Sequence, residues 1–188
     1  MKVSFGQKIP IALTQIQNRQ TGKFEPATVY EVDCKDKKDY EEVAYDGFNW
    51  CFSLDIAGNM CDKYNDKNQD SKSSFYILQN QNNETISRVQ IDHLWQNKYS
   101  LEWLDTKQDN GYKYVGQNIL SVAASEILKK GGNSLAIFSA IESANSFYSD
   151  TCQFEKVQGF FYMNEQQMKD FISRTEERTH SKFIDLKV

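Results

Sequence analysis

One segment of the chain, residues 116–130, shows the apolar spacing of an amphipathic helix. Apolar side chains recur there one and then three positions apart, which places them in a single stripe along about four turns of helix. The members of that stripe are Ile119, Leu120, Ala123, Ala124, Ile127 and Leu128. Lys129 and Lys130 suit the negative end of the helix, and Gly131 with Gly132 ends it. At the other end, the unpaired backbone N–H groups and the helix dipole predict an anion-binding site.

Alternating apolar and polar positions predict strands on both sides of this helix. A hairpin is predicted over about residues 8–33, with turn residues at Asn18–Gly22 between its arms. Two helices should follow it, at about 35–43 and 53–61, and then three strands, at 74–79, 85–92 and 99–106. After the long helix the pattern predicts a strand at 134–139, a helix at 142–149, a strand at 157–163 and a helix at 165–174.

This order of elements predicts a mixed α/β fold. Three consecutive strands indicate an antiparallel meander, whereas the strand, helix and strand centred on residues 116–130 indicate a parallel crossover. At 188 residues the chain is long enough for one domain with a full core and too short for two comfortable ones. We therefore expect one domain.

Composition narrows the classes of function. The formal net charge of -4 and the pI near 5.3 argue against a protein whose main task is to hold nucleic acid or an anionic membrane, and slightly favour a cationic substrate. Apolar residues make up 39% of the chain and the mean hydropathy is -0.67, which is polar for a globular protein. Aromatic residues, at 13%, nevertheless supply large burial per side chain, so a packed core is expected.

The sequence shows no pattern for a metal, a disulfide lattice or a membrane span. Its four cysteines include no Cys-x-x-Cys pair, and it has two histidines, so we expect reduced core thiols. The polar loop at 62–73 lacks the central glycine and terminal glutamate of a calcium loop. No segment approaches the roughly 18 apolar residues that a spanning helix needs, and the first ten residues lack an apolar signal core. The expected location is the cytoplasm.

Three features of residues 85–163 together resemble one known family. The stretch Tyr112-Lys-Tyr-Val-Gly-Gln-Asn-Ile-Leu120 is a glycine-bearing loop that leads into a helix, and Ser143-Ala-Asn-Ser-Phe-Tyr148 ends in Ala-x-x-Phe-Tyr. A predicted strand separates the two motifs. They resemble the Gln/Arg-x-x-Gly-x-Gly/Ala pyrophosphate loop and the Asn-x-x-Ala-x-x-Phe-Tyr signature of the GNAT superfamily of acyl-CoA-dependent N-acyltransferases, in the order of that family.

This resemblance implies a particular fold. It is a central, mostly antiparallel sheet flanked by helices, with a parallel strand pair that splays apart at the cofactor site. The chain is then one GNAT-like acetyltransferase domain over residues 1–188, with the hairpin of about 8–33 as an N-terminal extension. The alternative is an unrelated α/β protein with chance motif matches, which predicts that the strands at 99–106 and 134–139 do not splay beside Gly116.

The chain departs from the family pattern at several positions. Gly111 stands where glutamine or arginine is usual, Tyr114 where the first glycine of the loop is usual, and Ile141 where the signature has asparagine. Gln153-Phe154, with one extra residue, replaces a later Gly-Phe. Tyr114 and the missing Gly-Phe motivate a second alternative, a GNAT-fold acyl-CoA-binding or protein-interaction module without catalytic activity.

The resemblance implies transfer of an acetyl group from acetyl-CoA to a primary amine by direct attack in a ternary complex, without a metal. The diphosphate is expected on backbone N–H groups between Gly111 and Gln117, at the positive end of the helix. Backbone groups freed by the strand splay are expected to hold the pantetheine and polarise the acyl carbonyl. The residues implied in cofactor binding are Leu104, Asp105, Thr106, Gly111, Tyr112, Lys113, Tyr114, Val115, Gly116, Gln117 and Asn145.

The catalytic acid implied by the resemblance is Tyr148. It would protonate the leaving thiolate, since a phenol with a pKa near about 10 and a thiol near about 8.5 are close enough for proton transfer.

The candidate base is Glu102, because an amine that is mostly protonated at neutral pH must lose a proton before or during attack. Strict alternation along the strand puts Glu102 on the same face as Leu104 and Thr106. Asp92, Glu142 and a chain of water molecules remain alternatives.

The sequence does not identify the acyl acceptor. In the resembling family the first helices and the loops before the sheet set the acceptor, here about residues 34–73, and these show no readable motif. The acidic balance favours small amines, polyamines or basic protein termini. The protein is expected to act as a monomer or homodimer on a small-molecule or protein amine, and not on nucleic acid.

Overall fold

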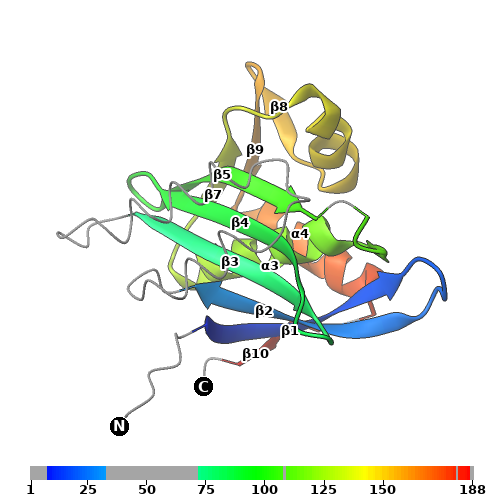
Figure 1. Ribbon diagram of the computed structural model, residues 1–188. Helices are drawn as coiled ribbons and strands as arrows, with labels where there is room; N and C mark the ends of the chain where they lie inside the picture. Colours follow the sequence, from blue (N-terminus) through cyan, green and yellow to red (C-terminus); the bar gives the residue numbers. More distant parts are fainter. Residues whose placement is uncertain (1–7, 33–71, 108, 181, 187–188) are drawn as a thin grey trace, which may run out of the picture.

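The computed structural model describes residues 8–32, 72–107, 109–180 and 182–186, and Figure 1 shows their arrangement. The helices expected at 35–43 and 53–61, and all but the end of the loop expected at 62–73, lie outside the described residues. The two strands and the helix expected to carry the site, at 99–106, 134–139 and 116–130, all lie within them.

A single sheet forms the centre of the molecule (Figure 1). Its strands are β1 (Lys8–Asn18), β2 (Phe24–Val32), β3 (Ser73–Asn80), β4 (Thr85–His93), β5 (Lys98–Thr106), β6 (Tyr112–Lys113), β7 (Ser134–Ile137), β8 (Glu155–Val157), β9 (Phe160–Asn164) and β10 (Ile184–Asp185). They lie in the order β10-β1-β2-β3-β4-β5-β7-β9-β8, and β6 pairs with the end of β1. The pairs from β1 to β5 are antiparallel, β5 and β7 are parallel, and β7, β9 and β8 are antiparallel. The hairpin, the meander and the parallel crossover are thus confirmed.

Two helices, α3 (Val115–Lys129) and α4 (Glu165–Arg178), pack side by side on one face of the sheet (Figure 1). The apolar stripe of α3 is buried there, and side chains from β1, β4, β5 and β7 join it in one core. Burial of that stripe, at about 25 cal/mol per Å² of apolar surface, is what holds the helix against the sheet.

Helix α3 ends as its glycines predict. The N–H of Gly132 donates to the carbonyl of Ile127 over 2.8 Å, and the N–H of Gly131 donates to Leu128 over 3.0 Å. Gly131 has a φ of 79°, a backbone conformation that glycine adopts without strain. A Cβ on Gly132 would collide with Ile127 and lie 2.7 Å from the ring of Tyr99, so the chain passes too close to its neighbours for any side chain.

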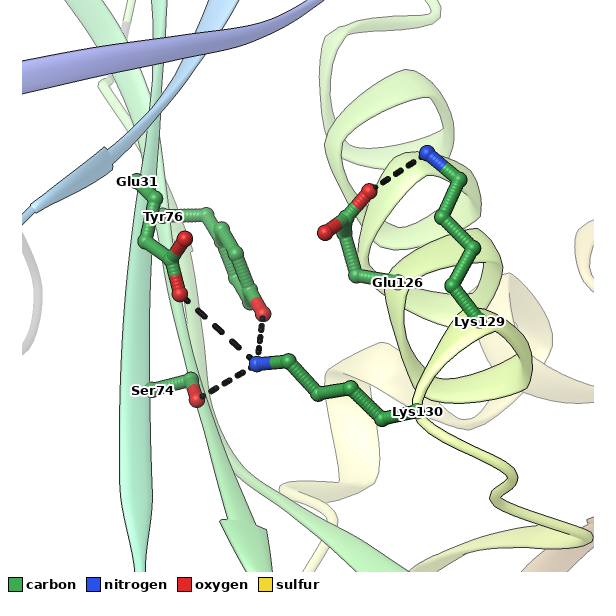
Figure 2. A network of polar contacts seen from close by, with 6 residues as sticks. All are labelled: Glu31, Ser74, Tyr76, Glu126, Lys129 and Lys130. Carbon is green, nitrogen blue, oxygen red and sulfur yellow. Dashed lines mark hydrogen bonds and ion pairs between the residues drawn. The ribbon is translucent and has the colours of Figure 1, made fainter. Parts of the chain in front are cut away.

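The last turn of α3 is attached to the sheet by Lys130 (Figure 2). Its Nζ lies 3.4 Å from Ser74 Oγ, 3.4 Å from the Tyr76 hydroxyl and 3.7 Å from Glu31 Oε1. Burial, followed by the charge of Glu31, raises the pKa of Tyr76, so its hydroxyl stays protonated. The C-terminal end of the helix is thereby held against β2 and β3.

The first turn of α3 is attached to β1. The hydroxyl of Thr14 donates to Asn118 Oδ1 over 2.8 Å, and Asn118 Nδ2 donates to the carbonyl of Gln15 over 2.9 Å. Asn118 is fully buried, its hydrogen bond with Thr14 is buried and the one with Gln15 is partly buried, so the two bonds fix the position of the helix start. The N-terminal hairpin therefore sets where the first turn of α3 lies.

Two predicted elements differ from the structure. In place of a helix at 142–149 there is a 3₁₀ turn, Glu142–Ala144, and then a π-helical turn, Phe147–Thr151, because no residue of the first turn is buried to support a regular helix. In place of one strand at 157–163 there is the hairpin of β8 and β9, since Gln158 and Gly159 both have positive φ, at 48° and 93°. Positive φ at both turn residues is the condition for a tight hairpin.

Helix α4 begins where predicted and runs one turn further. Asn164 accepts from the N–H of Gln167 over 2.9 Å, and the Gln167 side chain accepts from the N–H of Asn164 over 2.8 Å. This reciprocal capping box fixes the start. Burial of Thr175 near the far end carries the helix beyond residue 174.

Candidate active site

Strands β5 and β7 separate after the first third of β5. They pair only from Lys98 with Ser134 to Ser100 with Ala136, whereas β5 continues to Thr106 in pairing with β4. The edge of β5 beyond Ser100 is thus open towards the ends of β7 and the turns that follow it. This splay contradicts the alternative of an unrelated α/β protein, which required the two strands to stay together.

A β-bulge in β5 lies at the splay. Leu101 pairs with Ile91 and Trp103 pairs with Gln90, so Glu102 is the extra residue that has no partner on β4. Strict alternation therefore fails here, and the expectation that Glu102 shares a face with the later residues of β5 is wrong.

The carboxylate of Glu102 instead lies with Ser100. The hydroxyl of Ser100 donates to Glu102 Oε1 over 2.5 Å. Leu104 and Thr106 pair with Val89 and Ser87 of β4, on the face that packs against α3. The bulge thus separates the direction of the candidate base from that of the other two residues.

A pocket of about 370 Å³ fills the splay. Glu102 and Leu104 line it from β5, Tyr148 lines it from the π-helical turn, and Ile137 and Ala140 line it from the end of β7. The structure therefore brings together the two candidate catalytic residues and one of the candidate pantetheine-binding residues. We call this space the central pocket.

The side chain of Tyr148, the candidate acid, lines the central pocket. Its side chain is 7% exposed and its ring packs against Phe147, Phe154 and Phe161. Burial raises the pKa of Tyr148 to about 12, with a smaller contribution from Cys152. In the part of the chain that the structure describes, no protein group hydrogen-bonds to its hydroxyl, which leaves that hydroxyl available to a ligand.

The loop before α3 lines a second pocket, of about 240 Å³. Thr106 at the end of β5 and Phe147 of the π-helical turn close it, and the first turn of α3 forms its base. The cofactor-binding candidates that line it are Thr106, Tyr112, Tyr114, Val115, Gly116 and Gln117. We call this space the loop pocket.

Gly116 lies where three elements meet. A Cβ at this position would be 3.4 Å from Thr106 Oγ1 and 3.5 Å from Phe147 Cζ. A methyl group fits at van der Waals distance, but a larger side chain would fill the space above the N–H groups of the first turn. The small residue keeps those donors open to an anion.

Tyr114 adopts a left-handed backbone conformation at the start of α3. It is the N-cap of α3 and has a φ of 66°, in the left-handed region that favours glycine. Its ring stacks over Phe24 with centroids 6.3 Å apart and planes 8° apart. The ring thus leans towards the start of β2 while it also lines the loop pocket.

Arg19, in the turn between β1 and β2, was missed by sequence reasoning. Its Nε donates to the carbonyl of Tyr112 over 2.8 Å, its backbone N–H donates to the carbonyl of Gly111 over 2.8 Å, and its side chain lines the loop pocket. It places a guanidinium beside Gly111, the position where the family pattern has a glutamine or arginine. Only pairing between β6 and β1, which the sequence did not predict, brings it there.

Asp105 has a structural partner. Its side chain is 4% exposed, and its carboxylate lies 3.6 Å from Arg88 Nη2, directly across the β4–β5 ladder. Removing one member of such a buried pair typically costs about 3–5 kcal/mol. The structure thus engages the carboxylate in the sheet, and a cofactor role for Asp105 rests on its backbone.

The remaining cofactor-binding candidates lie outside the two pockets. Gly111 has a φ of 76° and Lys113 is exposed on β6, paired with Gln17. Asn145 follows the 3₁₀ turn, and its carbonyl accepts from the hydroxyl of Ser149 over 3.0 Å.

Two of the loop residues have their own polar partners. Tyr112 donates through its hydroxyl to Glu25 Oε2 over 3.2 Å, and burial followed by this hydrogen bond raises its pKa. Gln117 is buried, and its side-chain oxygen accepts from Arg178 over 3.3 Å. These contacts hold the loop between the hairpin and α4.

The described residues show neither a metal cluster nor a membrane-spanning helix. They contain no cluster of three histidine, cysteine or acidic side chains placed to hold a metal ion. Among the same residues, neither helix is long and apolar enough to cross a membrane.

Comparison with known proteins identifies the fold. No family model and no curated protein matches the sequence. Solved structures do match: an acetyltransferase of the GNAT family from Staphylococcus aureus aligns with a TM-score of 0.51 and 16% identity, over 74% of this chain and 99% of that one. The chain has the GNAT fold.

Two further solved structures are similar to this chain over most of its length. AtaTR, solved with acetyl-CoA bound, aligns with a TM-score of 0.58 and 13% identity, over 76% of this chain and 96% of that one. The ribosomal-protein-S18-alanine N-acetyltransferase of Escherichia coli aligns with a TM-score of 0.51 and 12% identity, over 73% and 93%. At these identities the likeness establishes the fold alone.

Proposed function

We propose that this protein transfers an acetyl group from acetyl-CoA to a primary amine by direct attack in a ternary complex. The observation that carries the proposal is the central pocket, where Glu102, Leu104 and Tyr148 meet at the splay of a GNAT fold. An acyl-CoA supplies an activated acyl group as a thioester. The residues of this chain would have to bind the diphosphate, transfer the protons and stabilise the charge that develops on the carbonyl oxygen.

The loop pocket fits a diphosphate. The N–H groups of the first turn of α3 have no side-chain cap and would donate to the anion, and Gly116 leaves them uncovered. The guanidinium of Arg19 adds a positive charge at the same place. The diphosphate would therefore lie between Arg19 and the helix start, with the pantetheine directed along β5 towards the central pocket.

Proton movement in the central pocket follows from the two candidate residues. The amine nitrogen forms a bond to the acyl carbon and gives a proton to the carboxylate of Glu102, while the carbon–sulfur bond breaks. The Tyr148 hydroxyl donates its proton to the leaving sulfur. Backbone N–H groups near Leu104 and Thr106, on the open edge of β5, would hold the carbonyl oxygen as charge develops on it.

The raised pKa of Tyr148 refines this role. A phenol with a pKa of about 12 is fully protonated at neutral pH, so it is always ready to donate. A thiolate released into the same desolvated pocket is also a stronger base than it is in water, because burial disfavours its charge. Burial thus raises the pKa of the phenol that donates the proton and the pKa of the thiol that forms when the sulfur accepts it.

Calorimetry with acetyl-CoA tests the proposal first, in the wild type and in Gly116→Ala and Gly116→Trp. The wild type should bind, the alanine should bind more weakly because its methyl just fits, and the tryptophan should abolish binding by covering the first turn of α3. Absence of binding in the wild type would overturn the proposal. Binding without turnover in a broad amine screen would instead favour a GNAT-fold binding module.

We also propose that residues 1–188 act as one GNAT-like domain, in which the hairpin of about residues 8–33 does more than extend the sheet. Arg19 and the hydrogen bonds of Asn118 to β1 support this, since both join the hairpin to the loop pocket.

A further inference from the structure

A third and larger pocket, of about 490 Å³, lies on the sheet face opposite α3 and α4. Ser134 and Ala136 of β7 line it, whereas the alternate residues Leu135 and Ile137 belong to the core beneath the helices. Because the residues at its floor are small, the sheet itself forms a hollow there. We call this space the aromatic pocket.

Large apolar side chains form the walls of this pocket. Trp95 and Phe138 are 57% and 54% exposed, and Phe160 lies beside Phe138 with ring centroids 5.6 Å apart. Val157 adds an aliphatic surface. Exposed aromatic side chains gathered around one hollow leave apolar area in water that a ligand can cover.

The aromatic pocket adjoins the candidate base. Ser100 pairs with Ala136, which lines the aromatic pocket, and its hydroxyl donates to the carboxylate of Glu102. Glu102 itself lines the central pocket, and its hydrogen bond with Ser100 joins it to the strand pair at the edge of the aromatic pocket. An amine nitrogen at Glu102 would therefore have its substituent beside Ala136.

The described lining of the aromatic pocket carries one acidic and one basic side chain. Glu155 lines the pocket, and the described part of the chain offers its carboxylate no ion-pair partner. Among the described lining residues the cation is Lys98, whose Nζ lies 5.9 Å from the centre of the Trp95 ring. An incoming amine would thus pass Glu155, whose carboxylate offsets the charge of Lys98, before it reaches Glu102 in the central pocket.

We propose that the acyl acceptor is a primary amine carried on an aromatic group, with the ring in the aromatic pocket and the nitrogen at Glu102. This inference rests on the proposed function and names its substrate class. Small arylalkylamines and peptides that begin with an aromatic residue share this chemistry, and the size of the pocket admits either.

The first test compares acceptors with acetyl-CoA as donor. The values of kcat/KM for 2-phenylethylamine and tryptamine should exceed those for putrescine and spermidine by about tenfold or more, because the aliphatic amines leave the rings exposed. Peptides that begin with phenylalanine, compared with the same peptides beginning with serine, identify the source of the amine. Equal or better turnover of the polyamines would overturn the inference.

The second test uses variants of the pocket wall. Phe138→Ala should raise the KM for 2-phenylethylamine about tenfold, change kcat by less than about threefold, and leave the dissociation constant of acetyl-CoA unchanged. Leu13→Ala is the matched control, since Leu13 is also an exposed apolar residue but lies on β1, far along the sheet. An unchanged KM in Phe138→Ala would count against the pocket.

A binding measurement separates this inference from the proposed function. With coenzyme A present, 2-phenylethylamine should shift the tryptophan emission of the protein in a saturable way as it covers Trp95, and Trp95→Phe should lose that change. Acetyl-CoA binding, measured independently by calorimetry, reports on the proposed function alone. No saturable change beside normal acetyl-CoA binding would sink the aromatic acceptor and leave the acetyltransferase proposal standing.

Discussion

Arg19 donates a hydrogen bond from its side-chain Nε to the backbone carbonyl of Tyr112 over 2.8 Å. The two residues lie at the tip of the N-terminal hairpin and at the start of the loop before α3, and β6 pairs with β1 beside them. A hairpin that the sequence suggested to be an extension thus contributes a cation to the candidate diphosphate site. The position where the family pattern has a charged or polar side chain is glycine here, and Arg19 takes its place in space.

Replacing Arg19 by alanine should raise the dissociation constant of acetyl-CoA by about 10- to 100-fold, since a hydrogen bond to a charged group contributes about 1.5–3 kcal/mol. The loss should shrink at high salt, where the charge is screened in the wild type as well. Calorimetry at two ionic strengths measures both effects. Lys23→Ala, on the same hairpin, is the control; an equal loss there would mean that only net charge matters.

Replacing Tyr114 separates backbone strain from ring contacts. Tyr114→Gly removes the cost of a left-handed φ, about 1 kcal/mol, but also the stacking on Phe24, whereas Tyr114→Ala loses the stacking and keeps the strain. The glycine variant should therefore be more stable than the alanine variant by about 1 kcal/mol. Urea unfolding monitored by circular dichroism measures the difference, and equal midpoints would refute it.

Glu102→Gln should lower kcat by about 10²-fold or more and leave acetyl-CoA affinity unchanged, because the amide fits the same space but cannot accept the amine proton. Steady-state kinetics with a saturating acceptor measure this. Asp92→Asn and Glu142→Gln test the alternative bases in the same assay. If either of these lowers kcat as much as Glu102→Gln does, the base has been misassigned.

Tyr148→Phe should lower kcat by about 10²–10⁴-fold without weakening acetyl-CoA binding, because only the proton donor is removed. Wild-type kcat should show no loss from ionisation of Tyr148 between pH 7 and about 10, since its pKa is raised to about 12. Rates across that range, with burst analysis to isolate chemistry, provide the check. Unchanged turnover in the variant would exclude Tyr148 as the acid.

The same shift makes a prediction about stability. Because folding raises the pKa of Tyr148 above its unfolded value near 10, the stabilisation is complete below about pH 10 and is lost as the pH rises towards 12. At pH 11 the wild type should have lost about 1.4 kcal/mol relative to Tyr148→Phe, one pKa unit of differential interaction. Denaturant midpoints of both proteins at pH 8 and pH 11 would show it, and a constant difference would contradict it.

The sequence predicted the elements whose signals are local. Helix α3 could be predicted because its apolar stripe marks the buried face and the glycines mark its end. The meander could be predicted from the alternation of apolar and polar residues alone. The hairpin of β8 and β9 was missed although Gln158-Gly159 carries the turn signal, because the run was interpreted as one strand. The resemblance led to Tyr148, whose burial beside the splay the structure then showed.

The features that the sequence could not supply depend on contacts between distant residues. Arg19 and Gly111 lie far apart along the chain, and no local pattern indicates that they share a pocket. The bulge at Glu102 adds one residue to a strand without a glycine or proline to mark it, so alternation assigned the wrong face. The roles of these residues in binding and catalysis stay predictions.

The attachment of α3 at both of its ends has a consequence for how binding and folding are coupled. Asn118 joins the first turn to β1, and Lys130 joins the last turn to β2 and β3. A ligand that binds at the start of α3 therefore stabilises the docked hairpin by mass action, so donor affinity and hairpin docking form one thermodynamic cycle. Mutations on the outer strands of the sheet can then alter the affinity for the acyl donor although the mutated residues do not contact the donor. Deletion of the hairpin should therefore weaken donor binding.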